Sequence, residues 1–472
     1  MGRLFGTDGV RGIANLELTP ELALGLGRAA ATVFRSHRLI TRPLEGGLGL
    51  ITRPLEGGLG RPSVLIVRDT RRSGDLLEAA LSAGLLSAGS DVFACGVLPT
   101  PAAAFLAADV GADAGAVVSA SHNPAAHNGI KFFGPDGYKL SDGEEESIEA
   151  LMEASGGNAG AVLGADVGQI LSLPDAEDRY VAHALRCLEG RRLEGIKVVV
   201  DCANGAAFRT SPRALAEAGA EVVEMNVAPD GMNINVDCGS TNPSRLAEAV
   251  VRLGADAGLA HDGDADRVLA VDSRGELVDG DAIIAILATE LHEAGRLPAG
   301  LVVTTVMANL GFRVGMTAAG IDLVETAVGD RYVIEAMRRH GAGIGGEQSG
   351  HVILADCSTT GDGLITGLRL LARMASTGRP LSELARVVER YPQVLVNVPV
   401  RDRAALSGAA GVWEAVDAVR AELGELGRVL VRPSGTEAVV RVMVEASGAA
   451  IAEQAAATIV DAVLRDLGDP AS

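Results

Sequence analysis

The hydrophobic residues of this chain follow one pattern three times. Each time, a short apolar strand leads through a loop into a helix, and the sequence Ala-Gly-x-acid then introduces another apolar strand. A helix that ends at a glycine and turns directly into a buried strand is typical of α/β units. The opening strands are expected at 64–67, 198–200 and 302–303, and the Ala-Gly-x-acid sequences stand at 88–91, 218–221 and 319–322. Recurrence at such long intervals predicts three homologous α/β domains.

Capping residues indicate where several helices begin. Thr19 and Ser211 each precede a proline, which favours a cap followed by proline at the first helical position. Asp75 and Glu78 have the spacing of a capping box. We therefore predict helix starts at these three places, with the first helix at about 20–35.

The C-terminal part of the chain has a different pattern. Valines alternate with other residues at 394–398, 429–431 and 440–444, as in half-buried strands. The last two of these strands flank the turn Pro433-Ser434-Gly435-Thr436. We expect a smaller α+β domain whose hairpin carries this turn. The predicted domain limits are 1–175, 176–277, 278–391 and 392–472.

Composition narrows the choice of partners. The chain has 472 residues, of which 48% are hydrophobic and 22% charged, and this size is typical of several soluble globular domains. Its formal net charge of -20 repels nucleic acid and anionic membrane surfaces. A phosphorylated substrate would therefore be captured by local arginines, and the candidates in Gly-, Ser- or Asp-rich stretches are Arg11, Arg71, Arg267, Arg331, Arg432 and Arg441.

Cysteine usage and the N-terminal sequence indicate the compartment. The cysteines are odd in number, scattered and without a C-x-x-C pair, which argues against zinc and fits a reduced cytosol: Cys95, Cys187, Cys202, Cys238 and Cys357. The sequence begins without a basic-then-apolar signal, and no apolar run approaches the length of a membrane span. We expect a cytoplasmic protein that binds neither membrane nor nucleic acid.

The loop DGDADR at 262–267 suggests a metal site. Three carboxylates at alternate positions repel one another unless a cation lies between them, and ligation by oxygen alone favours Mg²⁺. A calcium-binding helix-loop-helix would need Gly and Glu where Arg267 and Ser273 stand. For this loop alone, a solvated acidic turn remains the alternative.

Three further segments could carry chemistry. Ser121 lies in SASHNP, which suggests a phosphorylatable serine, although a Ser/Asn-rich turn before proline is common. The loop GEQSGH at 346–351 offers the donors and acceptors that a polyhydroxylated ring needs. In RPSGTE at 432–437, a guanidinium, two hydroxyls and backbone N–H groups could cradle a phosphate, or the segment could be a plain hairpin turn.

In chain order, FGTDGVRG, SASHNP with NGIKFF, DGDADR, GEQSGH and RPSGTE resemble motifs of the α-D-phosphohexomutases. Five ordered motifs over essentially the whole chain make the resemblance highly specific. It implies three α/β domains with mixed sheets around a central cleft and a smaller C-terminal α+β domain. It also implies a bacterial enzyme that interconverts glucosamine 6-phosphate and glucosamine 1-phosphate on the route to UDP-N-acetylglucosamine.

The resemblance also implies roles for individual residues. Ser121 would be the phosphoserine, which passes its phosphoryl group to the sugar through a glucosamine 1,6-bisphosphate intermediate. One Mg²⁺ per chain would be held by Ser121, Asp262, Asp264 and Asp266. Arg11, Lys131, Arg267 and His351 would lie near the transferring group, with Lys131 and His351 as candidates for proton transfer. The residues that would bind the sugar or its distant phosphate are Glu347, Ser349, Arg432, Ser434, Gly435, Thr436 and Arg441.

Two departures from the family pattern concern the environment of the site. Ala265 stands where the metal loop usually has glycine, and Ala would be strained by about 1 kcal/mol if that position has a positive φ. The segment 125–127 lacks the aromatic and acidic residues that are usual there, which leaves its contacts near Ser121 open.

Gln348 favours glucosamine phosphate as the substrate, because family members that act on mannose or glucose phosphates usually carry Met or Glu at this position. A phosphomannomutase or phosphoglucomutase remains the alternative within enzymes, and a non-catalytic sugar-phosphate-binding protein on the same scaffold is the alternative outside them. The sequence leaves the oligomeric state open, a homodimer included.

A tandem duplication stands apart from these motifs. LITRPLEGGLG occurs at 39–49 and again at 50–60, between the first helix and the strand at 64–67. Neither copy contains an acid-base constellation, so we expect a tolerated surface insertion with no catalytic part.

Overall fold

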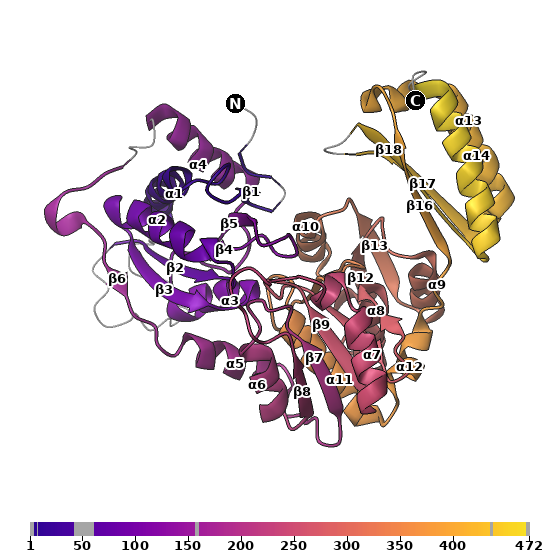
Figure 1. Cartoon of the computed structure of the whole chain (residues 1–472), viewed down its shortest axis with the longest axis horizontal. Coiled ribbons are helices and arrows are strands. Elements are labelled where there is room, and N and C mark those ends of the chain that lie inside the picture. Colours follow the sequence, from indigo (N-terminus) through magenta and orange to yellow (C-terminus); the bar gives the residue numbers. More distant parts are fainter. Residues whose placement is uncertain (1–3, 7, 42–60, 156–159, 435–437, 469–472) are drawn as a thin grey trace. The chain divides into compact units, whose positions relative to one another are not determined.

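The computed structural model describes residues 4–6, 8–41, 61–155, 160–434 and 438–468 (Figure 1). Contacts within the chain divide it into two compact units. The first unit is Met1–Val306 with Ile321–Arg386, and the second is Met307–Gly320 with Val387–Ser472. The duplicated sequence lies outside the described residues from position 42 onward.

The N-terminal sheet is mixed and has the strand order β1-β5-β4-β2-β3-β6. Its parallel part consists of β2, β3, β4 and β6, while β5 runs antiparallel to both β4 and β1. The strands are β1 Val10–Ile13, β2 Ser63–Arg68, β3 Asp91–Val97, β4 Ala114–Val118, β5 His127–Phe133 and β6 Ile170–Leu171, and the helices are α1 Pro20–Thr41, α2 Ser73–Ser87, α3 Thr100–Val110 and α4 Asp142–Ser155.

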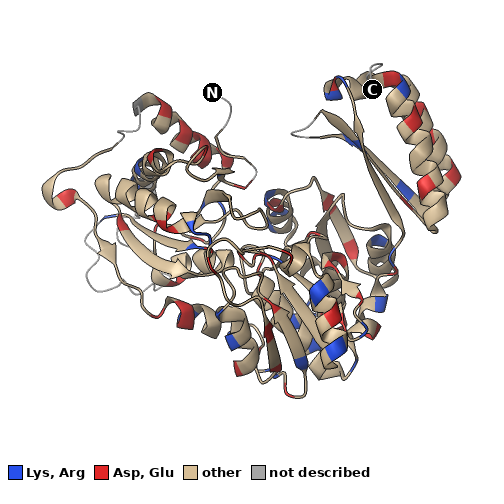
Figure 2. Cartoon of the chain, viewed as in Figure 1, with Lys and Arg blue, Asp and Glu red and all other residues tan. Residues whose placement is uncertain are grey.

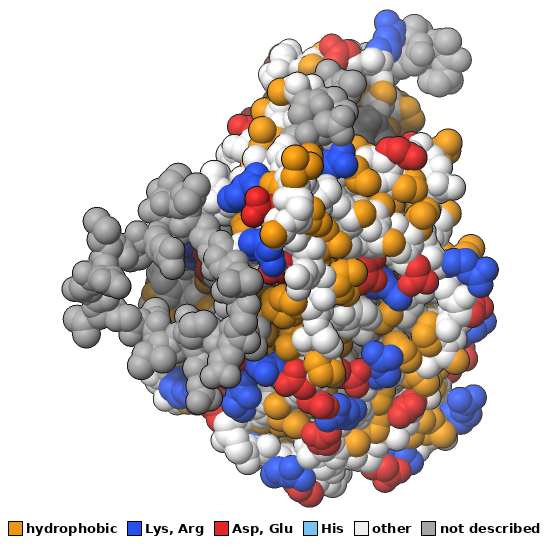
Figure 3. All heavy atoms as spheres, turned by 90° about the vertical axis from the view of Figure 1, so that its left-hand side faces the viewer, with side chains coloured by type: hydrophobic (Ala, Val, Ile, Leu, Met, Phe, Trp, Pro, Cys, Tyr) orange, Lys and Arg blue, Asp and Glu red, His pale blue; other side chains and the backbone are white. Residues whose placement is uncertain are grey.

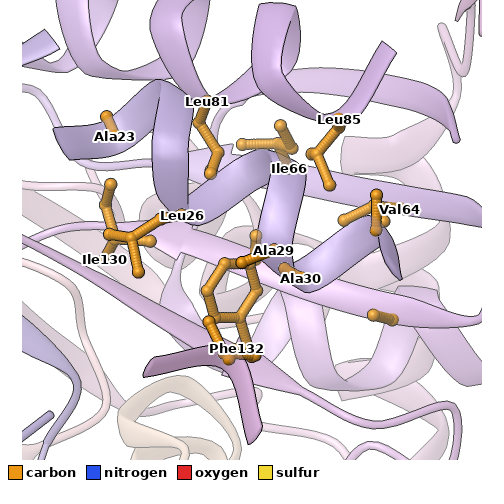
Figure 4. Close-up of a cluster of buried hydrophobic side chains, with 14 of the residues drawn as sticks. Ala23, Leu26, Ala29, Ala30, Val64, Ile66, Leu81, Leu85, Ile130 and Phe132 are labelled. Carbon is orange, nitrogen blue, oxygen red and sulfur yellow. The ribbon is translucent and has the colours of Figure 1, made fainter. Parts of the chain in front are cut away.

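The core of this part lies where α1 and α2 pack against the sheet. The two helices approach closely at Gly27 and Gly84, where the lack of a side chain leaves room. A Cβ at Gly27 would lie 2.4 Å from the carbonyl oxygen of Leu81, and one at Gly84 would lie 2.2 Å from that of Leu24. Figure 4 shows side chains from α1, α2, β2 and β5 meeting in one buried cluster, among them Leu26, Ala29, Leu81, Leu85, Ile66 and Phe132.

Two more sheets complete the α/β architecture. The second has the order β11-β10-β9-β7-β8 and the third the order β13-β12-β14-β15. The second comprises β7 Lys197–Asp201, β8 Glu221–Met225, β9 Ala257–His261, β10 Val268–Asp272 and β11 Leu277–Val278, with α5 Ala176–Arg186, α6 Thr210–Glu217 and α7 Ser244–Leu253. The third comprises β12 Leu301–Thr305, β13 Asp322–Thr326, β14 Ile344–Gly346 and β15 Val352–Leu354, with α8 Gly280–Glu293, α10 Asp330–His340, α11 Gly363–Thr377 and α12 Leu381–Leu384.

The second unit contains an antiparallel sheet in the order β16-β18-β17. Its strands are β16 Gln393–Pro399, β17 Gly427–Pro433 and β18 Val439–Ala446, and its helices are α9 Leu310–Ala318, α13 Ala410–Leu423 and α14 Ala449–Leu467. Glu445 of β18 is fully buried and accepts hydrogen bonds from Arg428 and from the backbone N–H of Leu310 at the start of α9. The predicted fold class, three α/β domains with mixed sheets and a C-terminal α+β domain, is confirmed.

The Ala-Gly-x-acid sequences act as predicted, whereas two predicted helix caps are wrong. Gly89, Gly219 and Gly320 each have a positive φ, and β3, β8 and β13 begin two residues after them. Helix α1 begins at Pro20, and the Thr19 hydroxyl accepts a hydrogen bond from the N–H of Leu22, but the helix continues to Thr41 instead of ending near residue 35.

Tertiary contacts explain the two wrong caps. Helix α2 begins at Ser73, and the carboxylates of Asp75 and Glu78 both pair with Arg68 instead of forming a capping box. Helix α6 begins at Thr210, which places Ser211 inside it, where the hydroxyl bonds to Nε2 of His261 at 2.8 Å.

Acidic residues, which outnumber basic ones in the sequence, are concentrated in some surface segments (Figure 2). Helix α4 has Asp142, Glu144 and Glu145 in its first turn and is one of the acidic segments in Figure 2. On the face in Figure 3, the described Lys and Arg side chains are mixed with acidic and hydrophobic ones rather than gathered into one basic region. Among the described residues, no helix is both long and apolar enough to cross a membrane.

Candidate active site

Ser121 and the acidic loop meet in the interior of the first unit. Ser121 lies just after β4, and the loop 262–267 joins the antiparallel strands β9 and β10. The Ser121 hydroxyl donates to Oδ2 of Asp262 at 2.5 Å, and both residues are buried. A Cβ at Gly263 would lie 2.5 Å from the carbonyl oxygen of Ser121, so the close approach of the two loops requires glycine there.

The three loop aspartates form a compact carboxylate cluster. One oxygen from each of Asp262, Asp264 and Asp266 lies within 4.8 Å of the others, and all three side chains are buried. Oδ1 of Asp264 and Oδ1 of Asp266 have no hydrogen-bond partner among the described residues. Buried carboxylate oxygens are normally satisfied, and these oxygen donors suit a hard divalent cation. The residues present therefore fit Mg²⁺, with Ser121 close enough to supply a further oxygen.

The charges around the cluster shift its protonation unevenly. Burial and the charges of Asp266 and Asp264 raise the pKa of Asp262 well above its ordinary value. Burial also acts to raise the pKa of Asp266, but the charges of His351, Lys131 and Arg267 outweigh it and lower this pKa. Asp262 therefore keeps a proton more readily than Asp266, and a bound cation would replace that proton.

Lys131 of β5 holds a positive charge against this cluster. Its Nζ donates to Oδ2 of Asp264 at 2.9 Å and lies 3.7 Å from Oδ2 of Asp266. Thr100, at the start of α3, donates its hydroxyl to the same oxygen of Asp264 at 2.5 Å. Burial acts to lower the pKa of Lys131, but Asp264, Asp8 and Asp266 together raise it well above its ordinary value. The raised pKa favours the charged ammonium form of Lys131.

His351 lies on the other side of Asp266. Nε2 of His351 accepts the N–H of Gly361 at 3.1 Å, which leaves the ring proton of the neutral form on Nδ1, 3.6 Å from Oδ2 of Asp266. A Cβ at Gly361 would lie 2.5 Å from the imidazole ring. Burial acts to lower the pKa of His351, but Asp266 and Asp330 raise it overall.

A second ionic chain, which sequence reasoning missed, extends the site. Nζ of Lys139 bonds to Oδ1 of Asp8 and to Oδ2 of Asp330, each at 2.5 Å. Arg11 pairs with Asp8, and Asp330 lies 3.8 Å from Nε2 of His351. Asp8 lies in the motif FGTDGVRG, so its polar, glycine-rich setting was an available signal. Lys139 carries no local signal, because its two partners, Asp8 and Asp330, are both more than a hundred residues away from it in the sequence.

The turn between β14 and β15 brings Glu347, Gln348 and Ser349 toward the metal loop. A Cβ at Gly350 would lie 2.3 Å from the carbonyl oxygen of Val268, just after that loop. Glu347 accepts the N–H of Gly329 at 3.2 Å, and Gln348 donates to Asp279 at 3.3 Å, while Ser349 is exposed.

Arg267 completes the part of the predicted site that lies in the first unit. Its Nε is 3.6 Å from Oδ1 of Asp266. Burial acts to lower the pKa of Arg267, but Asp266, Asp262 and Glu347 raise it. The first unit therefore brings together the predicted serine, aspartates, lysine, histidine and this arginine.

The predicted phosphate clamp lies in the second unit. Arg432 of β17 and Arg441 of β18 are opposite each other in the sheet. Burial and the charge of Arg441 lower the pKa of Arg432. Ser434 is buried, and its carbonyl oxygen accepts Nη1 of Arg403 at 2.7 Å. Gly435 and Thr436 lie outside the described residues.

Two arginines expected to capture phosphate point elsewhere. Arg71 is fully buried and bonds to Asp69 and to backbone carbonyls. Arg331 bonds to Asp142, to Glu145 and to the carbonyl oxygen of Leu140. The prediction is therefore wrong for Arg71, whose guanidinium is buried and bonded within the protein, and it stays a prediction for Arg331.

Two residues of the site have left-handed backbone conformations. Ser121 has a φ of 49° and Ala265 a φ of 56°. A residue with a Cβ is strained in this region, and for Ala265 the strain is the one expected from the sequence. Next to Ser121, Nδ1 of His122 lies 3.4 Å from the hydroxyl oxygen.

Family models match four consecutive parts of the chain. They describe the phosphoglucomutase/phosphomannomutase alpha/beta/alpha domain I at residues 49–158, domain II at 178–275, domain III at 279–391 and the C-terminal domain at 395–462.

Curated relatives and solved structures cover nearly the whole chain. A phosphoglucosamine mutase of Rhodococcus opacus is 54% identical over 97% of this chain and 98% of that protein. One of Streptomyces avermitilis is 53% identical over 99% of this chain and 100% of that protein. A phosphoglucomutase/phosphomannomutase family protein of Burkholderia thailandensis shares the fold with a TM-score of 0.78 at 24% identity, over 99% of each chain. An N-acetylglucosamine-phosphate mutase in its product complex aligns with a TM-score of 0.67 at 16% identity, over 98% of this chain and 96% of that one.

Proposed function

The chain belongs to the phosphoglucomutase/phosphomannomutase family, the α-D-phosphohexomutases, and we propose that it interconverts glucosamine 6-phosphate and glucosamine 1-phosphate. Relatives more than 50% identical over nearly the whole chain carry the name phosphoglucosamine mutase. Gln348 supports the same substrate, since family members that act on glucose or mannose phosphates usually carry another residue there. The reaction makes the chain an isomerase of amino sugar metabolism.

One observation carries the mechanism. The Ser121 hydroxyl lies 2.5 Å from Asp262, inside a buried cluster of three carboxylates, two of whose oxygens have no hydrogen-bond partner in the part of the chain that the structure describes. Phosphoryl transfer depends mainly on positioning and on stabilising charge, so a serine of ordinary basicity is sufficient there. We assign Ser121 as the phosphoserine. Asp262, Asp264, Asp266 and a phosphoserine oxygen would hold one Mg²⁺, which neutralises charge on the phosphoryl oxygens when bound.

The transfer proceeds in two balanced steps. First, the bond from Ser121 Oγ to phosphorus breaks as a sugar hydroxyl forms its own bond to that phosphorus, which gives glucosamine 1,6-bisphosphate. After the bisphosphate has turned end for end, Ser121 Oγ takes back the other phosphoryl group. In the first step the sugar hydroxyl loses its proton and the released Ser121 Oγ gains one, and in the second step Ser121 Oγ loses that proton and the released sugar oxygen gains one. His351 is the proton carrier that its two flanking carboxylates favour, while Lys131, held charged by Asp264, stabilises phosphoryl oxygens.

The remaining predicted residues bind substrate in this proposal. Glu347 and Ser349 hold sugar hydroxyls, and Arg11 and Arg267 face the transferring phosphate. The phosphate at the far end of the sugar is held by Arg432, Ser434, Gly435, Thr436 and Arg441. A clamp of arginine and backbone N–H groups accepts the 1-phosphate and the 6-phosphate alike, which a turning intermediate requires.

Several wider assignments belong to the same proposal. The domain limits remain 1–175, 176–277, 278–391 and 392–472. All five cysteines are free thiols, which supports a cytoplasmic location. A homodimer is the assembly we propose to test by light scattering.

A comparison of kcat/KM tests the substrate assignment. Glucosamine 6-phosphate, glucose 6-phosphate and mannose 6-phosphate would be assayed with the same Mg²⁺ and the same bisphosphate activator. We expect the highest kcat/KM for glucosamine 6-phosphate. A higher value for glucose or mannose 6-phosphate would assign the chain to the alternative mutases, and no turnover of any of the three would favour a binding protein.

A further inference from the structure

The backbone of the phosphoserine loop is held by a buried arginine. Arg71 follows β2 and is fully buried. Its Nη2 donates to the carbonyl oxygens of Ser121 at 2.8 Å and Asn123 at 2.9 Å, and its Nη1 donates to that of Pro124 at 2.6 Å. One planar guanidinium thus fixes three carbonyl groups of a single loop, and its rigid fork makes that geometry specific.

Asp69 orients this arginine and joins it to the serine from the other side. Oδ2 of Asp69 accepts Nε of Arg71 at 2.8 Å and the hydroxyl of Ser119 at 2.6 Å. The Ser119 hydroxyl oxygen in turn accepts the backbone N–H of Ser121 at 2.9 Å. Both backbone polar groups of Ser121 are therefore bonded within one network that runs through the Asp69–Arg71 pair.

The network holds Ser121 in a strained backbone conformation that fixes the direction of its hydroxyl. Its φ of 49° lies in the left-handed region, where a residue with a Cβ is strained and stays only if its surroundings hold it. Once φ and ψ are fixed, only rotation about the Cα–Cβ bond moves Oγ, which points at Asp262. Asn235, from the second sheet's part of the unit, donates to the carbonyl oxygens of Ser121 and Asn123 and adds to the same hold.

We propose that Arg71, oriented by Asp69, is a positioning residue for phosphoryl transfer: it holds Ser121 in its left-handed conformation so that Oγ stays aligned with the carboxylate cluster. The proposal rests on the function proposed above and adds a residue that touches neither metal nor substrate. Arg71 acts through the carbonyl groups of the loop. Its loss should therefore lower the rate of transfer while leaving substrate affinity and metal affinity nearly unchanged.

The main test compares Arg71→Met with Arg369→Met in the full chain. Arg369 is a matched control, because it is also buried and donates to a carbonyl oxygen, that of Cys187 at 3.1 Å, yet lies outside the loop network. For Arg71→Met we expect kcat to fall about 100-fold, the size of effect that small misplacements of reacting groups produce. The KM for glucosamine 6-phosphate and the Mg²⁺ concentration for half-maximal activity should both stay within about twofold. Arg369→Met should lower thermal stability without that loss of kcat.

Two further variants decide the matter if Arg71→Met does not fold. Ser119→Ala keeps the Asp69–Arg71 ion pair and removes the hydroxyl that links Asp69 to the Ser121 N–H, so kcat should fall about tenfold at unchanged KM. Arg71→Lys keeps the charge but not the fork and should have an intermediate kcat. Phosphorus NMR of the phosphorylated serine gives a second readout: one sharp resonance for the unaltered chain, and a shifted or broadened one for Ser119→Ala.

Transfer in a single turnover separates the two proposals. The chain would be phosphorylated with glucose 1,6-bisphosphate and then mixed with glucosamine 6-phosphate. If the unaltered chain transfers its phosphoryl group and the Ser119 and Arg71 variants transfer it equally fast, the positioning role is wrong and the proposed function stands. A change in KM alone would also overturn the positioning role. If the unaltered chain transfers nothing, the proposed function fails, and the positioning role fails with it.

Discussion

The carboxylate cluster of the first unit and the arginine pair of the second unit hold charge in opposite ways. In the cluster, acidic groups predominate, and the basic side chains beside it pair with its carboxylates, as Lys131 does with Asp264. In the second unit, two like charges, Arg432 and Arg441, face each other across neighbouring strands. In the proposed function, a cation stabilises the first arrangement and a phosphate anion the second. The group that we propose to transfer phosphate and the group that we propose to recognise it are therefore built from opposite charges.

This contrast predicts two kinds of variant. Changes in the cluster should lower kcat or metal affinity, because in the proposed function these groups act on the reacting atoms. Changes at the arginine pair should raise KM, because in the proposed function this pair binds a phosphate that does not react.

Replacement of the nucleophile should have the largest effect. Ser121→Ala should lower kcat by at least about 10⁴-fold, since removing a catalytic nucleophile typically has an effect of that size or more. Intact-mass analysis after incubation with glucose 1,6-bisphosphate should show no phosphorylated protein. Activity close to that of the unaltered chain would place the phosphoryl carrier elsewhere.

Loss of one metal ligand should act on metal affinity first. Asp264→Asn should raise the Mg²⁺ concentration for half-maximal activity at least about tenfold, and chelation should abolish turnover until Mg²⁺ is restored. Asp272→Asn is the matched control, because Asp272 is also buried but pairs with Arg274 away from the cluster. Full activity in excess chelator would contradict the metal assignment.

An arginine of the second unit should change recognition instead. Arg432→Ala removes a charge-assisted contact with phosphate that contributes about 1.5–3 kcal/mol, so KM should rise about 10- to 100-fold with kcat nearly unchanged. Arg420→Ala removes an equal charge from α13 and should change neither. A fall in kcat at constant KM would show that Arg432 takes part in phosphoryl transfer, which would contradict the division of roles between the two regions.

The strained alanine of the metal loop should matter little. Ala265→Gly relieves about 1 kcal/mol of backbone strain but adds a similar entropy to the unfolded chain. The free energy of unfolding, measured in urea, should change by less than about 0.5 kcal/mol, with Mg²⁺ affinity unchanged. A larger gain in stability or affinity would show that Ala265 distorts the loop.

The duplicated sequence should have the smallest effect. Deleting residues 50–60 shortens a connection, and halving a loop changes its closure free energy by only about 0.6 kcal/mol. We expect an unchanged kcat and an equal or slightly higher Tm. Loss of activity or a clearly lower Tm would mean that the second copy takes part in packing or in the site.

The sequence predicted those parts of the molecule that are determined locally. Gly89, Gly219 and Gly320 end their helices because the chain must reverse within a few residues, and only glycine adopts that conformation without strain. The aspartates of DGDADR were recognisable because alternate carboxylates in one tight loop have few uses other than a cation.

The parts that failed depend on partners distant in the sequence. Asp75 and Glu78 have capping spacing, but Arg68 of β2 binds both carboxylates. Arg71 lies in a polar stretch that suggests phosphate capture, yet its guanidinium is enclosed by the loop that carries Ser121. Lys139 joins Asp8 to Asp330 across more than three hundred residues of sequence. Such contacts follow from the tertiary arrangement, which local pattern does not contain.

Transfer of a radiolabelled phosphoryl group tests the central claim most directly. The chain would be labelled at Ser121 and mixed with unlabelled glucosamine 6-phosphate in the presence of Mg²⁺. Our account predicts that the label leaves the protein within one turnover, appears in glucosamine 1,6-bisphosphate and then distributes between the protein and the sugar phosphates. Label that stays on Ser121, or that appears only as inorganic phosphate, would contradict it.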